Sequence, residues 1–183
     1  TLVMALAVAK GIRQTLGRDS REAVAKVGIK WPNDIVVDGK KVCGILTEMS
    51  MEQGYIHHIV IGVGINVRRQ EFSEEIRERA AAIDEQCGVC ISRSQLIADI
   101  MEAFEEDYEI FLQTHDLKGL RDSYAKLLVN RDREVCVLDP KGEYRGIARG
   151  INDQGELIVE RQDGTVEEVY AGEVSVRGIY GYV

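Results

Sequence analysis

Residues 27–67 have the sequence VGIKWPNDIVVDGKKVCGILTEMSMEQGYIHHIVIGVGINV, and this stretch decides the fold. Four of its segments are rich in β-branched and other apolar residues, as strands are: Val27–Trp31, Ile35–Val37, Lys41–Met51 and Tyr55–Val67. Asp38-Gly39 suits a tight turn that needs positive φ, and Glu52-Gln53-Gly54 indicates a second turn. The stretch therefore predicts an antiparallel meander of three or four strands.

The segment Lys30-Trp31-Pro32-Asn33-Asp34 separates the first two predicted strands. Pro32 has no backbone N–H and restricts Trp31 to an extended conformation, so the first strand must end or bulge here. Asn33 and Asp34 would then lie on a rigid corner and offer an amide and a carboxylate to a ligand. The alternative is that Pro-Asn-Asp is ordinary turn chemistry and that Lys30 is a surface lysine.

The last predicted strand alternates between two kinds of residue. Successive residues of a strand point to opposite faces. Five apolar side chains share one face, which is expected to face the core: Ile59, Ile61, Val63, Ile65 and Val67. The other face carries Gly62, Gly64 and Asn66. Glycine within a strand costs stability, and a ligand lying flat against the backbone would explain it, as would a packed helix or a bulge. The glycines lack the third glycine and the following helix of a dinucleotide-binding motif, which excludes NAD.

Lys41 is a single cation among apolar neighbours on the third predicted strand, and Gly44 follows on the same strand. Such a lysine is either an edge residue that reaches solvent or a charge directed at a carboxylate or phosphate. His57 and His58 are adjacent on the next strand, so we expect them on opposite faces, unable to bind one metal ion together. No Ser-His-Asp or Cys-His set is discernible, and nucleophilic catalysis is not expected.

Helical periodicity flanks this sheet segment on both sides. The expected helices cover residues 2–16, residues 71–86, a stretch capped by Ser92, and residues 117–128. The chain opens within the first of these helices, so we expect that an upstream portion is missing. After Asn130, five short β-like segments alternate with turn sequences: Glu134–Leu138, Tyr144–Ile151, Glu156–Glu160, Val166–Tyr170 and Val174–Arg177. They predict a small barrel or sandwich, and hence two domains, 1–130 and 131–183.

Composition and charge exclude several classes of protein. The 183 residues are 45% apolar and 30% charged, as in an ordinary globular protein. The net charge is −8, yet residues 1–70 carry 10 basic and 6 acidic side chains. This cationic part suits an anionic small molecule, and no clustered Lys and Arg residues indicate a nucleic-acid surface. The longest apolar run, Leu2–Ala9, is too short for a bilayer and lacks the flanks of a signal peptide, which predicts a cytoplasmic protein without membrane contact.

Four cysteines are too few for a disulfide-stapled scaffold. Cys87-Gly88-Val89-Cys90 has the CxxC spacing of zinc and redox sites. The three histidines offer no second pair with suitable spacing for zinc, and the motif follows a helix-like stretch rather than a strand. We expect a loop with incidental thiols; a redox or zinc function is the alternative.

Three motifs, in this order, resemble the signature of biotin–protein ligases: Lys30–Asp34, Lys41-x-x-Gly44-Ile45-Leu46-x-Glu48 and Ile61-Gly62-x-Gly64-Ile65-Asn66-Val67. The segments Arg145–Gly155 and Gly172–Arg177 are similar to that family's small terminal domain. The resemblance covers essentially the whole chain. It implies an α+β fold like that of class II aminoacyl-tRNA synthetases, with a mixed sheet flanked by helices, followed by an SH3-like barrel.

The resemblance also implies a two-step reaction. Biotin and Mg-ATP give biotinyl-5′-adenylate and pyrophosphate. A lysine of the biotin carboxyl carrier protein of acetyl-CoA carboxylase then attacks the mixed anhydride and releases AMP. A homodimer is plausible by the same resemblance.

Functional residues follow from their positions in the motifs. The resemblance implies that Lys41 is the catalytic residue and bridges the biotin carboxylate and the α-phosphate. It implies a biotin pocket formed by Lys41, Gly44, Ile45, Gly62 and Gly64. It implies an ATP site, with Mg²⁺ arriving on the nucleotide, formed by Lys30, Asn33, Asp34 and Asn66. No side chain is assigned as a metal ligand.

One feature of the family has no counterpart in this sequence. The glycine- and arginine-rich loop that closes over biotin and the adenylate lies, in the family, upstream of the first helix predicted here. We therefore expect an N-terminally incomplete catalytic domain that leaks the adenylate or fails to form it. The alternatives are a non-catalytic ligand- or carrier-binding fragment and a lipoate–protein ligase, an enzyme of the same fold. No DNA-binding domain can be assigned.

Overall fold

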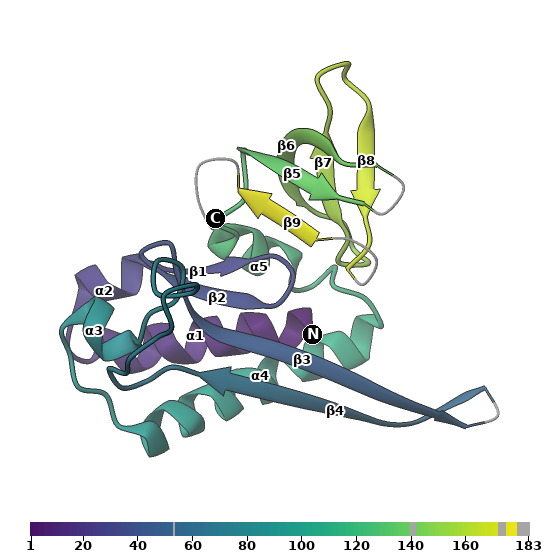
Figure 1. The fold of residues 1–183 in the computed structure, drawn as a ribbon. Coiled ribbons are helices and arrows are strands. Elements are labelled where there is room, and N and C mark those ends of the chain that lie inside the picture. Colours follow the sequence, from purple (N-terminus) through teal and green to yellow (C-terminus); the bar gives the residue numbers. More distant parts are fainter. Residues whose placement is uncertain (53, 140–141, 172–174, 179–183) are drawn as a thin grey trace.

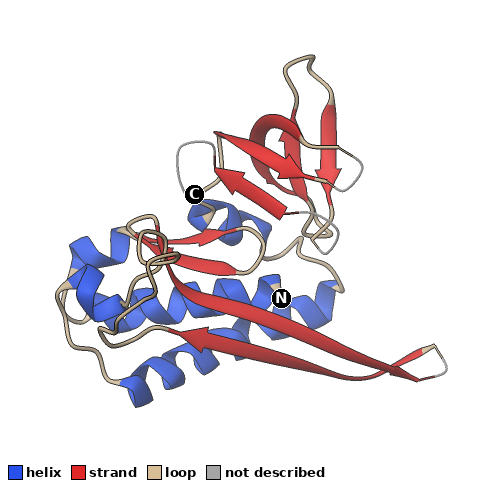
Figure 2. Cartoon of the chain, in the orientation of Figure 1, coloured by secondary structure: helices blue, strands red, loops and turns tan. Residues whose placement is uncertain are grey.

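The computed structural model describes the chain except residues 53, 140–141, 172–174 and 179–183. Figure 1 shows a long sheet packed on helices and a second, smaller sheet from the last third of the chain. Figure 2 shows the helices gathered on one side of the first sheet. The expected α+β fold class is confirmed.

The first sheet has four antiparallel strands in chain order. They are β1 (Val27–Lys30), β2 (Asp34–Val37), β3 (Lys40–Glu52) and β4 (Tyr55–Ile65). The β2–β3 turn is the expected Asp38-Gly39, with φ of 51° and 76°. Positive φ at both central residues matches the twist of the flanking strands. The predicted antiparallel meander is confirmed.

Helices α1 (Leu2–Gly17) and α4 (Arg93–Thr114) pack on each other along one face of this sheet. They approach closely at Gly11, where an added Cβ would lie 2.5 Å from Ile100 Cγ1. The expected Ser92 cap is present, since its hydroxyl accepts from the Gln95 N–H. No helix in the described ranges combines the length and apolar content needed to cross a membrane.

A buried carboxylate fastens α1 to α4. Asp99 accepts hydrogen bonds from the Arg18 guanidinium, and from the Thr15 hydroxyl over 2.6 Å. The Arg18 hydrogen bond is the main cause that holds the pKa of Asp99 well below its ordinary value, against the opposing effect of burial. Asp99 therefore remains charged inside the interface and contributes to folding as an anion.

The helix predicted over residues 71–86 is wrong for most of its length. Residues 74–79 form turns, and α3 spans Ile83–Cys87. The Lys41 N–H donates to the Arg79 carbonyl over 2.7 Å, and the Ala81 N–H donates to the Lys41 carbonyl over 2.9 Å. Backbone groups bonded to a strand in this way cannot also form helical bonds, so tertiary contacts override the local helical preference.

Two short helices, α2 (Arg21–Ala25) and α5 (Arg121–Leu127), complete the helical part. The helix predicted over 117–128 therefore begins four residues late. Residues 118–120 form a turn ahead of α5, and the Leu117 N–H donates to the Asp153 carbonyl over 2.7 Å, which ties the start of the segment to the second sheet.

The hairpin of β3 and β4 extends past the helices (Figure 1). The face of β4 predicted to face the core is partly exposed, since Ile59 is 51% and Val63 36% exposed. Ile61 and Ile65 pack partly against the core, and Val67 is buried. The predicted core face is thus wrong at Ile59 and Val63, and near the tip no described helix reaches far enough to cover the strand.

The second sheet has five antiparallel strands in the order β8-β7-β6-β5-β9. Their bounds are Arg133–Leu138 (β5), Tyr144–Ile151 (β6), Leu157–Glu160 (β7), Val166–Val169 (β8) and Ser175–Gly178 (β9). Each predicted β-like segment corresponds to one of these strands. Residues 172–174 of the terminal motif lie outside the described residues. The division into domains 1–130 and 131–183 stays a prediction.

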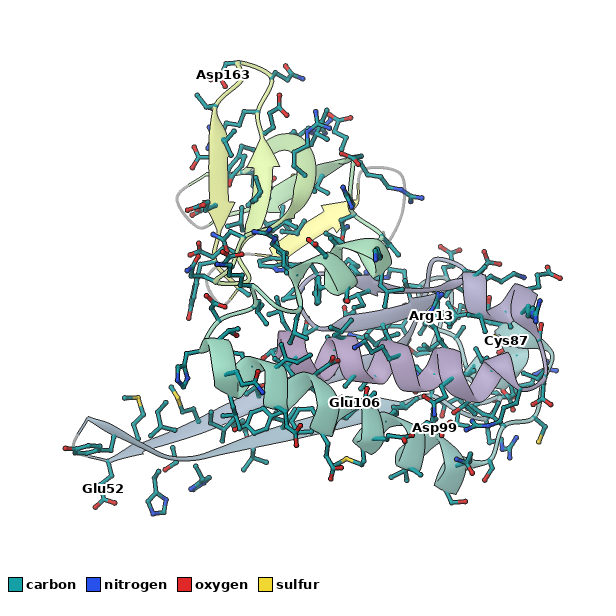
Figure 3. All side chains as sticks on the ribbon, turned by 180° about the vertical axis from the view of Figure 1, so that it is seen from behind. Arg13, Glu52, Cys87, Asp99, Glu106 and Asp163 are labelled. Atoms are coloured by element: carbon teal, nitrogen blue, oxygen red, sulfur yellow. The ribbon has the colours of Figure 1, made fainter. Side chains whose placement is uncertain are left out.

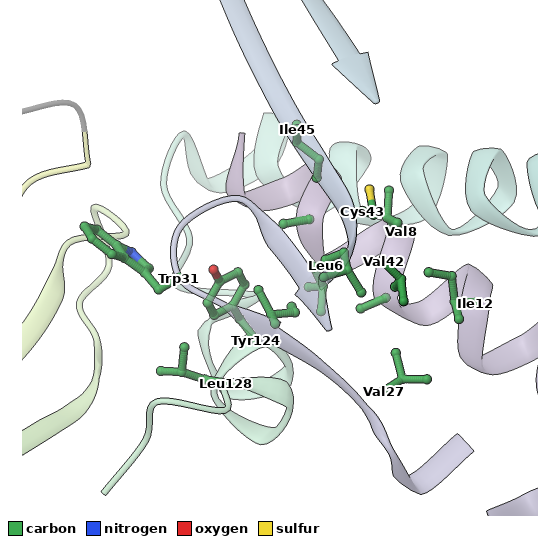
Figure 4. Packing of buried hydrophobic residues seen from close by; sticks show 14 of the residues in the cluster. Leu6, Val8, Ile12, Val27, Trp31, Val42, Cys43, Ile45, Tyr124 and Leu128 are labelled. Atoms are coloured by element: carbon green, nitrogen blue, oxygen red, sulfur yellow. The ribbon is translucent and has the colours of Figure 1, made fainter. Parts of the chain in front are cut away.

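One cluster of buried apolar side chains joins the helices to both sheets. Figure 4 shows Trp31 and Tyr124 at one side of this cluster, with Leu6 and Ile12 of α1 further along. The Trp31 side chain is directed toward the second sheet (Figure 4). The corner predicted from Pro32 is thus anchored in the core by its own tryptophan.

Candidate functional site

The corner, residues 30–34, is held from behind by two other parts of the chain. The Trp31 backbone N–H donates to Asn130 Oδ1 over 3.2 Å. The Trp31 indole N–H donates to the Gly155 carbonyl over 3.0 Å. Both bonds are buried, which makes them costly to lose. The corner is therefore a fixed part of the fold.

Side chains also fasten the front of the corner. The Tyr124 hydroxyl donates to the Pro32 carbonyl over 3.3 Å. Asn33 Nδ2 donates to the Ile45 carbonyl over 2.8 Å, and the Ile45 N–H donates to the Asn33 carbonyl over 3.0 Å. Asn33 thus connects the corner to β3, the strand that carries Lys41.

Asp34 lies between two lysines. Lys41 Nζ is 2.5 Å from Asp34 Oδ1, and Lys30 Nζ is 3.9 Å from Asp34 Oδ2. Lys30 is 8% exposed, so the alternative that it is a surface lysine is wrong. Two ammonium groups around one carboxylate leave a net positive charge, and partial burial strengthens its attraction for an anion.

The residues of this group of charges line two different cavities. The corner cavity has a volume of about 590 Å³, and both halves of the chain contribute to it, including Lys30, Asn33, Asp34, Gln154, Gly155 and Glu156. The glycine cavity has a volume of about 670 Å³, and its lining includes Lys41, Gly44, Gly64, Asn66, Phe72 and Ile76. Both volumes are typical of small-molecule sites. The Asp34–Lys41 ion pair joins the two cavities.

The glycines of β3 and β4 form an open surface. Gly44 and Gly64 are cross-strand partners, and Gly62 is opposite Leu46. In the described part of the chain, a Cβ on Gly64 would meet nothing nearer than the Gly44 carbonyl at 3.9 Å. A Cβ on Gly62 would meet the Leu46 carbonyl at 3.7 Å. No helix among the described residues packs against Gly62 or Gly64, so a packed helix does not explain them. The surface is accessible to a flat ligand.

Gly44 is explained by the lysine beside it. A Cβ at this position would lie 3.1 Å from both Cε and Nζ of Lys41. The missing side chain therefore leaves room for Lys41 to lie across the strand toward Asp34. Cys43 is next to it, and burial raises the pKa of its thiol to about 12. The thiol is protonated at neutral pH and is not a nucleophile.

The predicted site residues divide between the two cavities. Four of them line the glycine cavity: Lys41, Gly44, Gly64 and Asn66. Four others line the corner cavity: Lys30, Asn33, Asp34 and Ile45. Gly62 lines neither of them. Ile45 was predicted to bind biotin, but it lines the corner cavity with the predicted nucleotide residues. Asn66 was predicted to bind the nucleotide, but it lines the glycine cavity.

Two parts of the lining of these cavities were not predicted from the sequence. Phe72, Ile76 and Arg79 line the glycine cavity from the segment wrongly predicted as a helix. The spacing of Phe72 and Ile76 by four residues was the available signal, but it also suited a helix. Residues 152–155 separate two of the predicted β-like segments, yet nothing in their sequence indicated that this turn would reach the corner cavity.

The histidines depart from expectation. His57 Nδ1 lies 2.9 Å from His58 Nδ1, although the two side chains were expected on opposite faces. A register shift opposite Ser50 and Met51 breaks the strict alternation at this point. No group of three or more His, Cys, Asp or Glu residues that could hold a metal ion occurs among the described residues. Cys87 is the last residue of α3, so it does not lie in the expected loop, whereas Cys90 does; both are free thiols.

Comparison with known proteins matches both halves of the chain. Residues 1–66 match the model of the biotin/lipoate A/B protein ligase family, and residues 132–177 match the biotin protein ligase C-terminal domain. The bifunctional ligase/repressor BirA of Bacillus subtilis is 35% identical over 181 residues, which cover 96% of this chain and 52% of that protein. BirA of Escherichia coli is 32% identical over 179 residues, covering 97% and 52%. The chain thus spans about half the length of these relatives.

Solved structures agree with the sequence comparison. The apo biotin protein ligase of Aquifex aeolicus superimposes with a TM-score of 0.78 at 25% identity, covering 97% of this chain and 75% of that one. The same enzyme in complex with biotin and ATP gives a TM-score of 0.76, covering 97% and 72%. Both family models match, in the order that they have in the family, and the fold is similar as well. The chain therefore belongs to the biotin protein ligase family.

Proposed function

We propose that this chain carries the biotin and nucleotide site of a ligase that activates biotin with ATP and transfers it to a carrier protein. The observation that carries the proposal is the Lys30–Asp34–Lys41 group at the junction of two cavities. One cavity offers an open backbone surface, and the other offers an amide and a carboxylate on a rigid corner. The bound biotin and ATP of the Aquifex aeolicus enzyme support the same pair of substrates.

Lys41 has the position that the first step requires. The carboxylate of biotin must attack the α-phosphate of ATP, but both groups are anionic and repel each other. A cation fixed between them lowers this repulsion and stabilises the charge that builds on the phosphate oxygens in the transition state. Lys41 lines the glycine cavity, and Asp34, its ion-pair partner, lines the corner cavity.

Asp34 would prepare Lys41 for this function. Its carboxylate holds the ammonium group 2.5 Å away, and Gly44 leaves the space that this geometry needs. An incoming substrate anion would then meet a cation that is already oriented, which lowers the entropic cost of binding. Lys30, on the other oxygen of Asp34, would support the phosphate side.

Biotin would lie on the glycine surface. Its fused rings are flat and mostly apolar, so they gain most from a backbone they can approach without side chains in between. Gly44 and Gly64 provide that surface within the cavity, and Gly62 continues it along β4. The apolar side chains of Phe72 and Ile76 in the same cavity suit such a ligand.

The nucleotide would lie along the corner, with Lys30, Asn33 and Asp34 near its phosphates and Asn66 on the glycine side. Mg²⁺ fits this arrangement as an ion that arrives with ATP. It binds phosphate oxygens and waters and commonly takes one or two carboxylate or carbonyl ligands from protein. Asp34 and the Asn33 amide are the side chains of the corner that could provide such ligands.

In the second step, we propose that a lysine of the biotin carboxyl carrier protein of acetyl-CoA carboxylase attacks the mixed anhydride and releases AMP. The name of the Paracoccus denitrificans relative, biotin–[acetyl-CoA-carboxylase] ligase, supports this acceptor; it is 25% identical over 155 residues. We also propose a homodimer, because the chain resembles this family.

Pyrophosphate release separates the proposal from its alternatives. It is measured with ATP and either biotin or lipoate, on this chain and on a longer form that adds an upstream segment with the family's glycine- and arginine-rich loop. Release with biotin but not lipoate supports a biotin ligase. Release with lipoate alone would make the enzyme a lipoate ligase. Tight biotin binding without release by either form would leave a non-catalytic binding module.

A further inference from the structure

The turn that precedes β7, residues 152–156, builds a wall of the corner cavity. Gln154, Gly155 and Glu156 line that cavity together with the corner itself. The turn is stiff, because Asn152 Oδ1 accepts from the N–H groups of Gln154 and Glu156 over 3.1 and 2.9 Å. Part of the proposed nucleotide site therefore comes from the second sheet, about 120 residues away along the chain from the corner.

Three contacts fix this turn against Trp31 and the segment around α5. The Gly155 carbonyl accepts from the Trp31 indole N–H, a buried bond of 3.0 Å. Asp153 Oδ1 lies 2.6 Å from Arg121 Nη1, and the Asp153 carbonyl accepts from the Leu117 N–H over 2.7 Å. Gly155 has a φ of 86°, and an added Cβ would lie within 3 Å of side chains of Leu117 and Leu2.

Trp31 belongs to the corner and also bonds to the 152–156 turn. Its backbone N–H is fixed by Asn130, and its indole N–H holds Gly155, while its two chain neighbours belong to the corner. Figure 4 shows the indole directed away from the core of the first sheet, toward the strands of the second. We infer that Trp31 is a positioning residue: by holding the 152–156 turn, it sets the shape of the corner cavity and so the affinity for ATP, but not for biotin.

The inference rests on the proposed function, because it names ATP as the ligand of the corner cavity. It goes beyond that function by assigning nucleotide affinity to one hydrogen bond between the two sheets, made by Trp31 and Gly155, which both line the corner cavity. The glycine cavity has no lining residue from the second sheet among the described residues. A loosened turn should therefore change the binding of one substrate and leave the other unchanged, whereas general destabilisation would weaken both.

Trp31→Phe tests the inference, because it keeps a large aromatic ring and removes the indole N–H. Binding of ATP with Mg²⁺ and binding of biotin are measured separately by calorimetry on the full chain. We expect the Kd for ATP to rise about tenfold, the effect of one buried hydrogen bond, and the Kd for biotin to change less than twofold. Equal increases in both Kd values, or an unchanged Kd for ATP, would overturn the inference.

Asp153→Asn weakens the turn at a different contact and leaves Trp31 intact. It should raise the Kd for ATP about two- to threefold, as a half-exposed ion pair allows. Asp163→Asn is the matched control, since Asp163 lies in the β7–β8 turn at the far tip of the second sheet (Figure 3). It should change neither Kd. A control variant that raised the Kd for ATP as much would count against the inference.

Amide hydrogen exchange without ligands distinguishes this contact from the proposed function. The Leu117 amide, bonded to the Asp153 carbonyl, should exchange faster in Trp31→Phe than in the wild type. Unchanged exchange would show that Trp31 does not hold the turn. A wild-type chain that bound neither ATP nor biotin would contradict the proposed function, and with it the nucleotide half of the inference, whatever the exchange rates show.

Discussion

Gly64→Ala tests whether Gly64 is required for ligand binding or for the fold. An added Cβ would have the Gly44 carbonyl as its nearest neighbour, at 3.9 Å, which is ordinary contact distance. The substitution should therefore leave folding intact. It should even stabilise the protein by about 0.5–1 kcal/mol, because glycine within a strand loses more backbone entropy on folding than alanine.

Biotin binding should respond in the opposite direction. The new methyl group projects into the space that a flat ring would occupy in contact with the backbone of β4. Overpacking of this kind costs about 1–3 kcal/mol, which corresponds to a Kd for biotin about 5- to 150-fold higher. Calorimetric titration gives the Kd, and urea unfolding followed by circular dichroism gives the stability.

Gly17→Ala is the matched control. Gly17 is the last residue of α1, and an added Cβ would meet Val24 Cγ2 at an unstrained 3.6 Å. The variant should gain stability and bind biotin normally. The reasoning about the glycine surface is refuted if Gly64→Ala folds well and binds biotin as tightly as the wild type. A loss of more than about 1 kcal/mol in stability would instead show that Gly64 is required by the fold.

Three further predictions concern stability. Asp99→Asn should cost about 1.5–3 kcal/mol, because the hydrogen bonds from Arg18 and Thr15 lose their anionic acceptor while the Arg18 side chain, which is 45% exposed, can still be solvated. The low pKa of Asp99 stabilises the fold at neutral pH, so wild-type stability should fall as pH drops below about 4. The variant should lose this part of the acid dependence in urea unfolding at several pH values. Gly11→Ala should lower the stability by about 1–3 kcal/mol, because its Cβ would meet the Ile100 backbone at 2.7 Å; a variant as stable as the wild type in thermal melts would contradict that packing. Ser92→Ala should cost about 1 kcal/mol through the lost cap of α4, and an unchanged melting curve would argue against the cap.

Local chemistry made much of the fold predictable. Asp38-Gly39 specifies a turn with two positive φ values, and that turn fixes the pairing of β2 with β3. Pro32 ends β1 where expected, because it cannot continue the ladder. The five strands of the second sheet are separated by turn sequences that are recognisable one by one. In each case the determining interaction spans only a few residues.

Features that depend on distant contacts were not predictable. Residues 74–79 have helical composition, but the Arg79 carbonyl accepts from the N–H of Lys41, about forty positions earlier. Ile59 alternates like a core residue but lies beyond the reach of the helices. The division of the site into two cavities depends on Asp34 and on the 152–156 turn, which reaches the corner through Trp31. No spacing along the chain contains that information.

The most direct test of the account is biotin-dependent pyrophosphate release by Lys41→Ala, measured in the longer form that includes the glycine- and arginine-rich loop. Lys40→Ala is the control, since it removes the same charge one residue earlier on β3, and Lys40 lines neither cavity. The account predicts a rate about 10²–10³ lower for Lys41→Ala and a nearly unchanged rate for Lys40→Ala. Equal rates for the wild type and Lys41→Ala would contradict it.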